Sequence, residues 1–329
     1  MTNQLSEKTT TNALGPLRLP KGITVRAALQ KVLKLAINPL DTPLANNAVV
    51  TLYYLDINGV VTARVEKPIY ININPEAAAK LAVGKALASI ALIGGVDFKY
   101  IKYSTSFILS EENHNESLAV NKAFTVITNL MLKLGIESDD GFEKTAIALV
   151  SSGNCNAHDI KISGENNILF IDVSEGRARL GNSTLARAYD QTGNVSPDLD
   201  RSDYLVNVFQ AIQILISEGL ILSGIDISYG GLITSLCQMA VAGKCGIKVS
   251  MEVRQLPHYK LFAEEVGLLI EISDKDLVRV CTLLDIYQIT FECIGHTTIE
   301  KEISIICDSK TVLSENTDTI ESWRYMVEW

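Results

Sequence analysis

The chain has 329 residues, of which 47% are hydrophobic and 20% are charged, and its formal net charge at pH 7 is −9. This length predicts about two domains with a sizeable core. An acidic chain without a basic block is a poor binder of nucleic acid or anionic membranes, so we exclude both classes of partner. The longest apolar segment, Ala86–Val96, is shorter than the ~20 residues that a membrane-spanning helix needs.

The first residues and the cysteines indicate where such a protein works. Residues 1–18 are polar and lack the hydrophobic stretch of a signal peptide, which predicts a short disordered tail and a cytoplasmic protein. The six cysteines show no Cys-x-x-Cys spacing, and most lie among apolar residues. We therefore expect small core side chains, with no metal site and no disulfide.

Local patterns predict a mixed unit over residues 19–164. Apolar residues at helical spacing over 23–35 predict a short helix, and Asn58-Gly59 between two β-branched runs predicts a hairpin. Asn74-Pro75 is typical of a helix start. The predicted elements are a helix at 23–35, strands at 47–55 and 59–65, a helix at 74–93, a strand at 98–109, a helix at 117–134, and strand pieces at 146–151 and 160–162.

A second unit, residues 165–329, follows the polar turn at 163–166. Its first segment, 168–173, is a continuous apolar run that suits a buried strand. The further predicted strands are 221–226, 248–253, 268–272 and 303–306, and the predicted helices are 183–189, 205–218, 274–284 and one that starts after Gly230-Gly231.

The turn between the strand ending at Asp226 and the next helix supports two interpretations. Ser228 and the amides of Gly230 and Gly231 could hold a phosphate at the helix N-terminus, with Asp226 on Mg²⁺. Alternatively, the glycines permit tight packing and the serine caps the helix, which is the commoner use of a short glycine motif.

Three other segments contain candidate site residues. Gly181 and Ser183 lie between a predicted strand and a helix, where they could bind an anion or simply cap the helix. His296 follows a predicted strand and could reach a cleft. Glu264, next to Glu265, could serve a site, although such a pair more often lies on a helix face.

Several of these segments together resemble phosphoribosylformylglycinamidine synthase, a purine-biosynthesis ligase. The matching segments are 43–46, 180–186, 224–247, 261–267, 295–297 and 322–323. The resemblance runs from about Leu19 to the C-terminus and concerns only the second of the ligase's two homologous halves, without its first half or its glutaminase domain. It implies an α+β N-terminal domain of the barrel-interface type followed by an α/β domain, the aminoimidazole ribonucleotide synthetase-like two-domain architecture.

The resemblance also implies a nucleotide–Mg²⁺ site, whose ligands this chain has largely changed. The family's Leu-Ala-Asp ends in Asn46 here, and its Gly-Glu-Ala-Leu-Thr-Asn has Lys85 and Ser89 in place of Glu and Asn. Only Asp226 is kept among those ligand positions, and an ammonium cannot coordinate a metal because it only donates. We expect Lys85 to occupy the former metal position, in contact with Asp226.

We interpret the chain as a homologue that has lost ligase catalysis, binds no cofactor, and acts as a binding, regulatory or structural protein. We expect a homodimer through the N-terminal domain, because the family packs this domain against its counterpart, and a further protein partner is allowed. The alternative function is that of a ligase subunit or a nucleotide-binding protein that uses ATP or ADP with Mg²⁺. A third possibility is a truncated gene product without an independent role. The candidate nucleotide- or phosphate-binding residues are Asp226, Ser228, Gly230, Gly231, Gly181, Ser183, Glu264 and His296.

Overall fold

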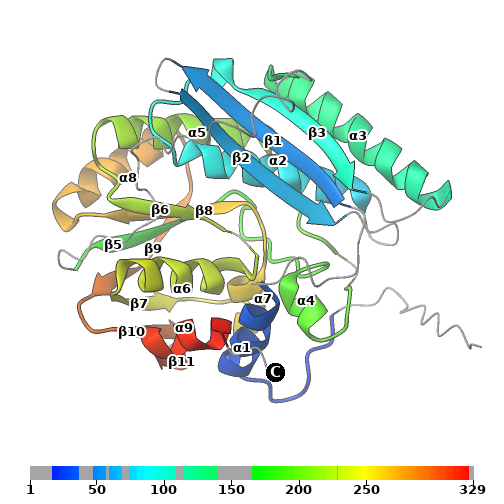
Figure 1. Cartoon of the computed structure of the whole chain (residues 1–329). Coiled ribbons are helices and arrows are strands. Elements are labelled where there is room, and N and C mark those ends of the chain that lie inside the picture. The colour runs from blue at the N-terminus through cyan, green and yellow to red at the C-terminus, as the bar shows by residue number, and fades with distance from the viewer. Residues whose placement is uncertain are drawn as a thin grey trace, which may run out of the picture.

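The computed structural model describes residues 17–36, 47–56, 59–68, 74–108, 114–138, 165–193, 195–227 and 229–325. Two sheets with their helices make up this part of the chain (Figure 1). Residues 1–16 of the predicted tail lie outside the described residues, as do the strand pieces predicted at 146–151 and 160–162.

The smaller unit contains a four-stranded sheet with two helices. Its strands are β1 (Asn47–Asp56), β2 (Gly59–Pro68), β3 (Lys102–Ile108) and β4 (Glu137–Ser138), in the spatial order β2-β1-β3-β4. The predicted hairpin is confirmed, because β1 and β2 pair antiparallel along their whole length. Helix α2 (Pro75–Ala91) packs on this hairpin, and α3 (His114–Leu134) packs on α2 (Figure 1).

The start of α2 follows the local sequence signals. Asn74 is the N-cap, and its side chain accepts a hydrogen bond from the backbone N–H of Ala77 at 3.0 Å. Pro75 occupies the first turn, where its missing N–H costs nothing. The predicted strand at 98–109 begins later than expected, because Phe98–Tyr100 forms a short 3₁₀ helix before β3.

The larger unit contains a seven-stranded mixed sheet. Its strands are β5 (Asn167–Asp172), β6 (Ser223–Asp226), β7 (Gly246–Met251), β8 (Gly267–Ile272), β9 (Phe291–Thr298), β10 (Glu302–Cys307) and β11 (Lys310–Asn316), in the order β11-β10-β7-β9-β5-β8-β6. Strands β5, β6, β7 and β10 run in one direction, so their C-terminal ends meet at one edge, which we call the carboxyl edge.

Helices cover both faces of this sheet (Figure 1). The helices are α1 (Val25–Ala36), α4 (Thr184–Ala188), α5 (Ser202–Ser217), α6 (Gly231–Gly243), α7 (Pro257–Phe262), α8 (Leu277–Ile286) and α9 (Thr317–Tyr325). Alternate β5 residues serve different faces: Leu169 belongs to the core with α5 and α8, and Ile168 to the core with α1, α6, α7 and α9. Helix α1 lies in the predicted N-terminal unit by sequence, but its buried side chains belong to the core of the larger unit.

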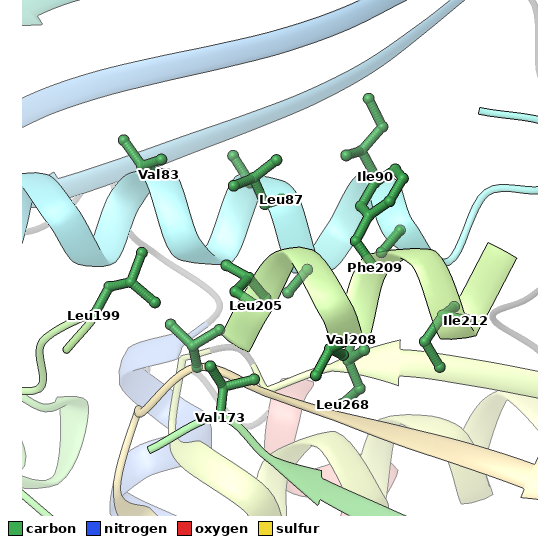
Figure 2. Packing of buried hydrophobic residues seen from close by; sticks show 14 of the residues in the cluster. Val83, Leu87, Ile90, Val173, Leu199, Leu205, Val208, Phe209, Ile212 and Leu268 are labelled. Carbon is green, nitrogen blue, oxygen red and sulfur yellow. The ribbon is translucent and has the colours of Figure 1, made fainter. Parts of the chain in front are cut away.

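Helix α2 joins the two units into one core. Figure 2 shows Val83, Leu87 and Ile90 of α2 above Leu205 and Phe209 of α5. The end of α2 is tied to α5 by Gln213, whose Nε2 donates to the carbonyls of Ala91 at 2.8 Å and Ile93 at 2.7 Å. Its Oε1 accepts from the N–H of Val96 at 3.0 Å. A helix buried on all sides by these contacts positions its residues firmly against the larger sheet.

Candidate functional site

The candidate site lies at the carboxyl edge, where α2 passes the end of β6. Gly84 allows this close approach, because a Cβ on it would lie 2.8 Å from Val266 Cγ2. The neighbouring side chain, Lys85, is consequently carried into the contact between the two units and is only 3% exposed. Ser89 is one turn further along α2 and is half-buried, whereas Asn46 lies outside the described residues.

The Lys85 ammonium donates to backbone carbonyls of the larger unit. Its Nζ donates to the carbonyl oxygen of Ile227, the residue after Asp226, and to that of Glu265 at 3.3 Å. These carbonyls come from the end of β6 and from the segment before β8. The ammonium therefore points into the protein just past the end of β6, and its contact with Asp226 stays a prediction.

These residues do not fit the nucleotide–Mg²⁺ site that the sequence resemblance implies. An ammonium offers no lone pair to a metal, and here it already holds two of the nearest carbonyl oxygens. In the part of the chain that the structure describes, no three His, Cys, Asp or Glu side chains gather as a metal site. The absence of a metal at this position stays a prediction, which the chemistry of Lys85 supports.

The glycine pair at the start of α6 serves packing. Gly230 and Gly231 have φ angles of +85° and +77°, a region that disfavours side chains. A Cβ on Gly230 would lie 2.7 Å from Val32 Cγ1 of α1, and one on Gly231 would lie 2.6 Å from the carbonyl carbon of Phe262. The packing interpretation of this turn is therefore supported. Ser228 lies outside the described residues, so its role stays a prediction.

A buried carboxylate already holds the amide at this turn. Glu264 is 3% exposed, and its Oε1 accepts from the N–H of Gly230 at 2.9 Å. The same oxygen accepts from the N–H of Thr184 at 2.7 Å and from its hydroxyl at 2.6 Å. Glu264 does not lie on a helix face, because α7 ends at Phe262 and the chain then turns toward β8. It links the starts of α4 and α6.

Ser183 caps α4, one of its two predicted roles. Its Oγ accepts from the N–H of Ala186 at 3.2 Å and donates to the carbonyl of Leu180 at 2.7 Å. Gly181 permits a close backbone crossing, since a Cβ there would lie 2.4 Å from the carbonyl oxygen of Val195. The cap is thus confirmed, and anion binding by this segment stays a prediction.

Sequence reasoning did not single out an ion pair beside this site. Arg179 donates to the Glu265 carboxylate through Nε at 2.7 Å and through a terminal nitrogen at 2.8 Å. Burial raises the pKa of the Glu265 carboxyl above its usual range, and the hydrogen bonds and charge of Arg179 oppose that rise. The partners are 86 residues apart in sequence, so no local pattern could have revealed the pair.

A groove of about 870 Å³ also opens at the carboxyl edge. Its walls come from residues 172–178 after β5, 250–256 after β7 and 290–294 at the start of β9. Asp172 shapes one wall, because its carboxylate accepts from the N–H groups of Ser174 and Gly176, each at 2.8 Å. Burial raises the pKa of Asp172, although these hydrogen bonds act in the opposite direction. None of the sequence-predicted candidates that the structure describes lines this groove.

His296 lies away from the other candidates. It does not follow a strand, as predicted, but lies within β9, where it pairs with Asn167 at the start of β5. Asp172, at the other end of β5, pairs with Gly267, next to the partner of Asp226. The β5 residue that pairs with His296 is five residues from the end of β5 that lies near Asp226. Five strand residues span about 17 Å at ~3.3 Å per residue. The structure therefore brings Asp226, Gly230, Gly231 and Glu264 to one region and leaves His296 at the opposite edge.

Comparison with family models divides the chain into two matched regions. The FGAR-AT PurM_N-like domain matches residues 28–163, and the C-terminal domain of AIR synthase related protein matches residues 173–308. Among the described residues, no helix combines the length and apolarity that crossing a bilayer requires.

Curated relatives match most of this chain. It is 32% identical to the probable phosphoribosylformylglycinamidine synthase, chloroplastic/mitochondrial, of Arabidopsis thaliana, over 92% of the chain and 25% of that protein. It is 32% identical to the phosphoribosylformylglycinamidine synthase of Homo sapiens, over 81% of the chain and 24% of that protein. The chain thus spans about a quarter of the length of these relatives.

Solved structures show the same fold at low identity. The chain resembles Thermotoga maritima PurL complexed with FGAR at a TM-score of 0.56 and 11% identity, over 89% of the chain and 52% of that one. The same PurL complexed with AMPPCP gives a TM-score of 0.53 at 10% identity, over 89% and 50%. Together with the two domain matches, these structures establish the predicted two-domain architecture.

Proposed function

Since the chain is a phosphoribosylformylglycinamidine synthase-like protein of the purine-biosynthesis ligase family, we propose that it keeps the ligase's architecture without its ligase chemistry. It acts as a binding or structural unit that needs no nucleotide and no metal. The observation that carries this proposal is the buried Lys85 ammonium on the carbonyls of Ile227 and Glu265.

Electrostatics favours this proposal over metal binding beside Asp226. A Mg²⁺ ion about 6 Å from the ammonium would meet about 5 kcal/mol of repulsion at an effective dielectric constant of about 20, an upper bound because the side chain can move. The family's glutamate would attract the same ion. A lysine in place of this glutamate carries a positive charge on its own side chain. Helix α2 can therefore bind the larger sheet without an ion.

The rival function is a nucleotide-binding subunit of a ligase. Relatives of this fold are complexed with FGAR or AMPPCP, and this chain keeps Asp226, Gly230 and Glu264. Against the rival, the Gly230 amide that would face a phosphate donates instead to Glu264 at 2.9 Å. A phosphate at this turn would have to displace a carboxylate that accepts three hydrogen bonds.

A turnover assay tests whether the chain has lost the ligase reaction. The purified chain is incubated with formylglycinamide ribonucleotide, ATP, Mg²⁺ and ammonium in a coupled ADP-release assay, with the human relative as positive control. We expect no ADP release above the no-enzyme rate. Release that requires formylglycinamide ribonucleotide and scales with the concentration of this chain would contradict the proposal.

We also propose that two copies associate through the smaller sheet. Helix α2 packs against one face of β1 and β2, and among the described strands β2 (Gly59–Pro68) lies at the edge of the sheet. Long unpaired strand edges favour association, and a symmetric dimer is the simplest closed solution. Sedimentation equilibrium at micromolar concentration should give a dimer mass, and a monomer mass would contradict the proposal.

A further inference from the structure

A small cavity separates α2 from the loop that follows β5. Its lining combines Ala78 and Leu81 of α2 with residues of the larger unit that include Asn182, Arg187, Ser196 and Glu264. The cavity has a volume of about 20 Å³. A cavity needs roughly 10–15 Å³ on this measure to hold a water molecule, so there is room for one.

Three of the residues that line this cavity carry a buried polar side-chain atom without a partner. The atoms are Oδ1 of Asn182, Nε of Arg187 and Oγ of Ser196, and none has a hydrogen-bond partner within the described part of the chain. Buried polar atoms are nearly always paired, because leaving one unpaired forfeits its hydration. Three such atoms around one cavity therefore indicate a ligand rather than three independent defects.

The loop is held in shape around this cavity. The N–H of Gly181 donates to the carbonyl of Val195 at 2.7 Å, and the N–H of Asn182 donates to that of Thr192 at 2.7 Å. Asn182 has a φ of +62°, a left-handed conformation that asparagine tolerates better than most residues. The backbone around Gly181 and Asn182 is thus held in place by these bonds.

Charge and size identify the ligand. The Arg187 guanidinium disfavours a cation, and the buried Glu264 carboxylate disfavours an anion. A water molecule can accept from Arg187 Nε–H, donate to Asn182 Oδ1, and either donate to or accept from Ser196 Oγ. Three such bonds are typical of a buried water, and a water suits either orientation of the asparagine amide.

We propose that this cavity is a binding site for one ordered water molecule that joins Asn182, Arg187 and Ser196 beneath α2. The water holds the segments around residues 182, 187 and 196 together, next to the ion pair between Lys80 of α2 and Asp198 at 2.7 Å. It also gives the segment around Gly181 and Ser183 a neutral ligand in place of the anion that its sequence allows. The inference does not depend on whether the chain has lost ligase chemistry.

Crystallography of the full chain tests the ligand directly. Crystals are grown in phosphate-free buffer, and a second set is soaked in excess inorganic phosphate. We expect one water peak about 2.7–3.2 Å from all three atoms, unchanged by the soak. A site without a peak, or one that phosphate enters, would overturn the proposal.

A double-mutant cycle tests the link in solution. Asn182→Gly keeps the left-handed backbone, and Ser196→Ala removes one hydroxyl. If both groups hold the same water, each change lowers the folding equilibrium constant about fivefold, and the double variant lowers it far less than the ~25-fold of independent effects. Backbone effects of the glycine cancel in the cycle. Additive single effects would overturn the proposal.

A matched cycle controls for general non-additivity. Ser217 is exposed and donates to the carbonyl of Ile214 at 2.8 Å, away from the cavity. Asn182→Gly combined with Ser217→Ala should be additive in urea unfolding. Equal coupling in both cycles would show that the coupling does not arise at the cavity, and would also overturn the proposal.

Discussion

Replacing Lys85 by methionine removes the ammonium and keeps most of the side-chain volume, so it isolates the contribution of the charge. The ammonium is 3% exposed and donates to the carbonyls of Ile227 and Glu265. Hydrogen bonds to charged groups contribute about 1.5–3 kcal/mol each, and the recovered desolvation of the ammonium offsets part of that. We expect Lys85→Met to lower the free energy of unfolding by about 2–4 kcal/mol.

Urea unfolding followed by circular dichroism measures this change, with the midpoint compared at an unchanged slope. Lys310→Met is the matched control, because Lys310 is exposed on β11 and should leave the midpoint unchanged. Lys85→Glu introduces the residue that the sequence resemblance implies for this position, but it places a carboxylate against two carbonyl oxygens. It should therefore destabilise the chain more than Lys85→Met does.

The measured stabilities of these two variants can refute the reasoning. If Lys85→Met is as stable as the parent chain within about 0.5 kcal/mol, or more stable, the ammonium does not hold α2 to the larger sheet. If Lys85→Glu has the same free energy of unfolding as the parent chain without added metal, the sign of the charge at this position does not affect stability. Either result would remove the observation on which the proposed function depends.

Three further predictions concern other parts of the chain. In urea unfolding, Gly231→Ala should lower the free energy of unfolding by at least about 3 kcal/mol and Gly219→Ala by about 1–2 kcal/mol. Both glycines have a positive φ, but of the two only Gly231 faces packed backbone. Equal losses of stability would contradict this. Burial lowers the pKa of His258, so the folded state binds fewer protons and stability should fall as pH drops through about 6.5; a His258→Phe variant with the same acid sensitivity would refute that assignment. Burial raises the pKa of Cys245 to about 11, whereas Cys293 is exposed, so peptide mapping after thiol labelling of the native protein should find Cys293 modified first; the reverse order would count against the burial argument.

Elements with short-range signals could be predicted from the sequence. The hairpin of β1 and β2 follows from Asn58-Gly59, and α2 begins where Asn74 and Pro75 place it. These signals depend on backbone preferences and on hydrogen bonds within a few residues. They act in the same way whatever the rest of the chain does, so the structure reproduces them.

Elements set by distant partners could not be predicted in this way. The sequence predicted a strand that ends before His296, whereas β9 continues to Thr298 because β5 and β7 flank it. Helix α1 has the apolar stripe that the sequence shows, but nothing local indicates that this stripe packs on the larger unit. For the same reason the sequence predicted that Lys85 would be buried only through a family resemblance, and did not identify its carbonyl partners.

Calorimetric titration of the purified chain with ATP and with ADP, each with and without Mg²⁺, tests the central claim most directly. The account predicts no saturable heat for any combination, because a lysine ammonium and an internal carboxylate already hold the groups that a metal and a phosphate would need. Saturable, Mg²⁺-dependent binding of either nucleotide would contradict it and would establish the nucleotide-binding alternative.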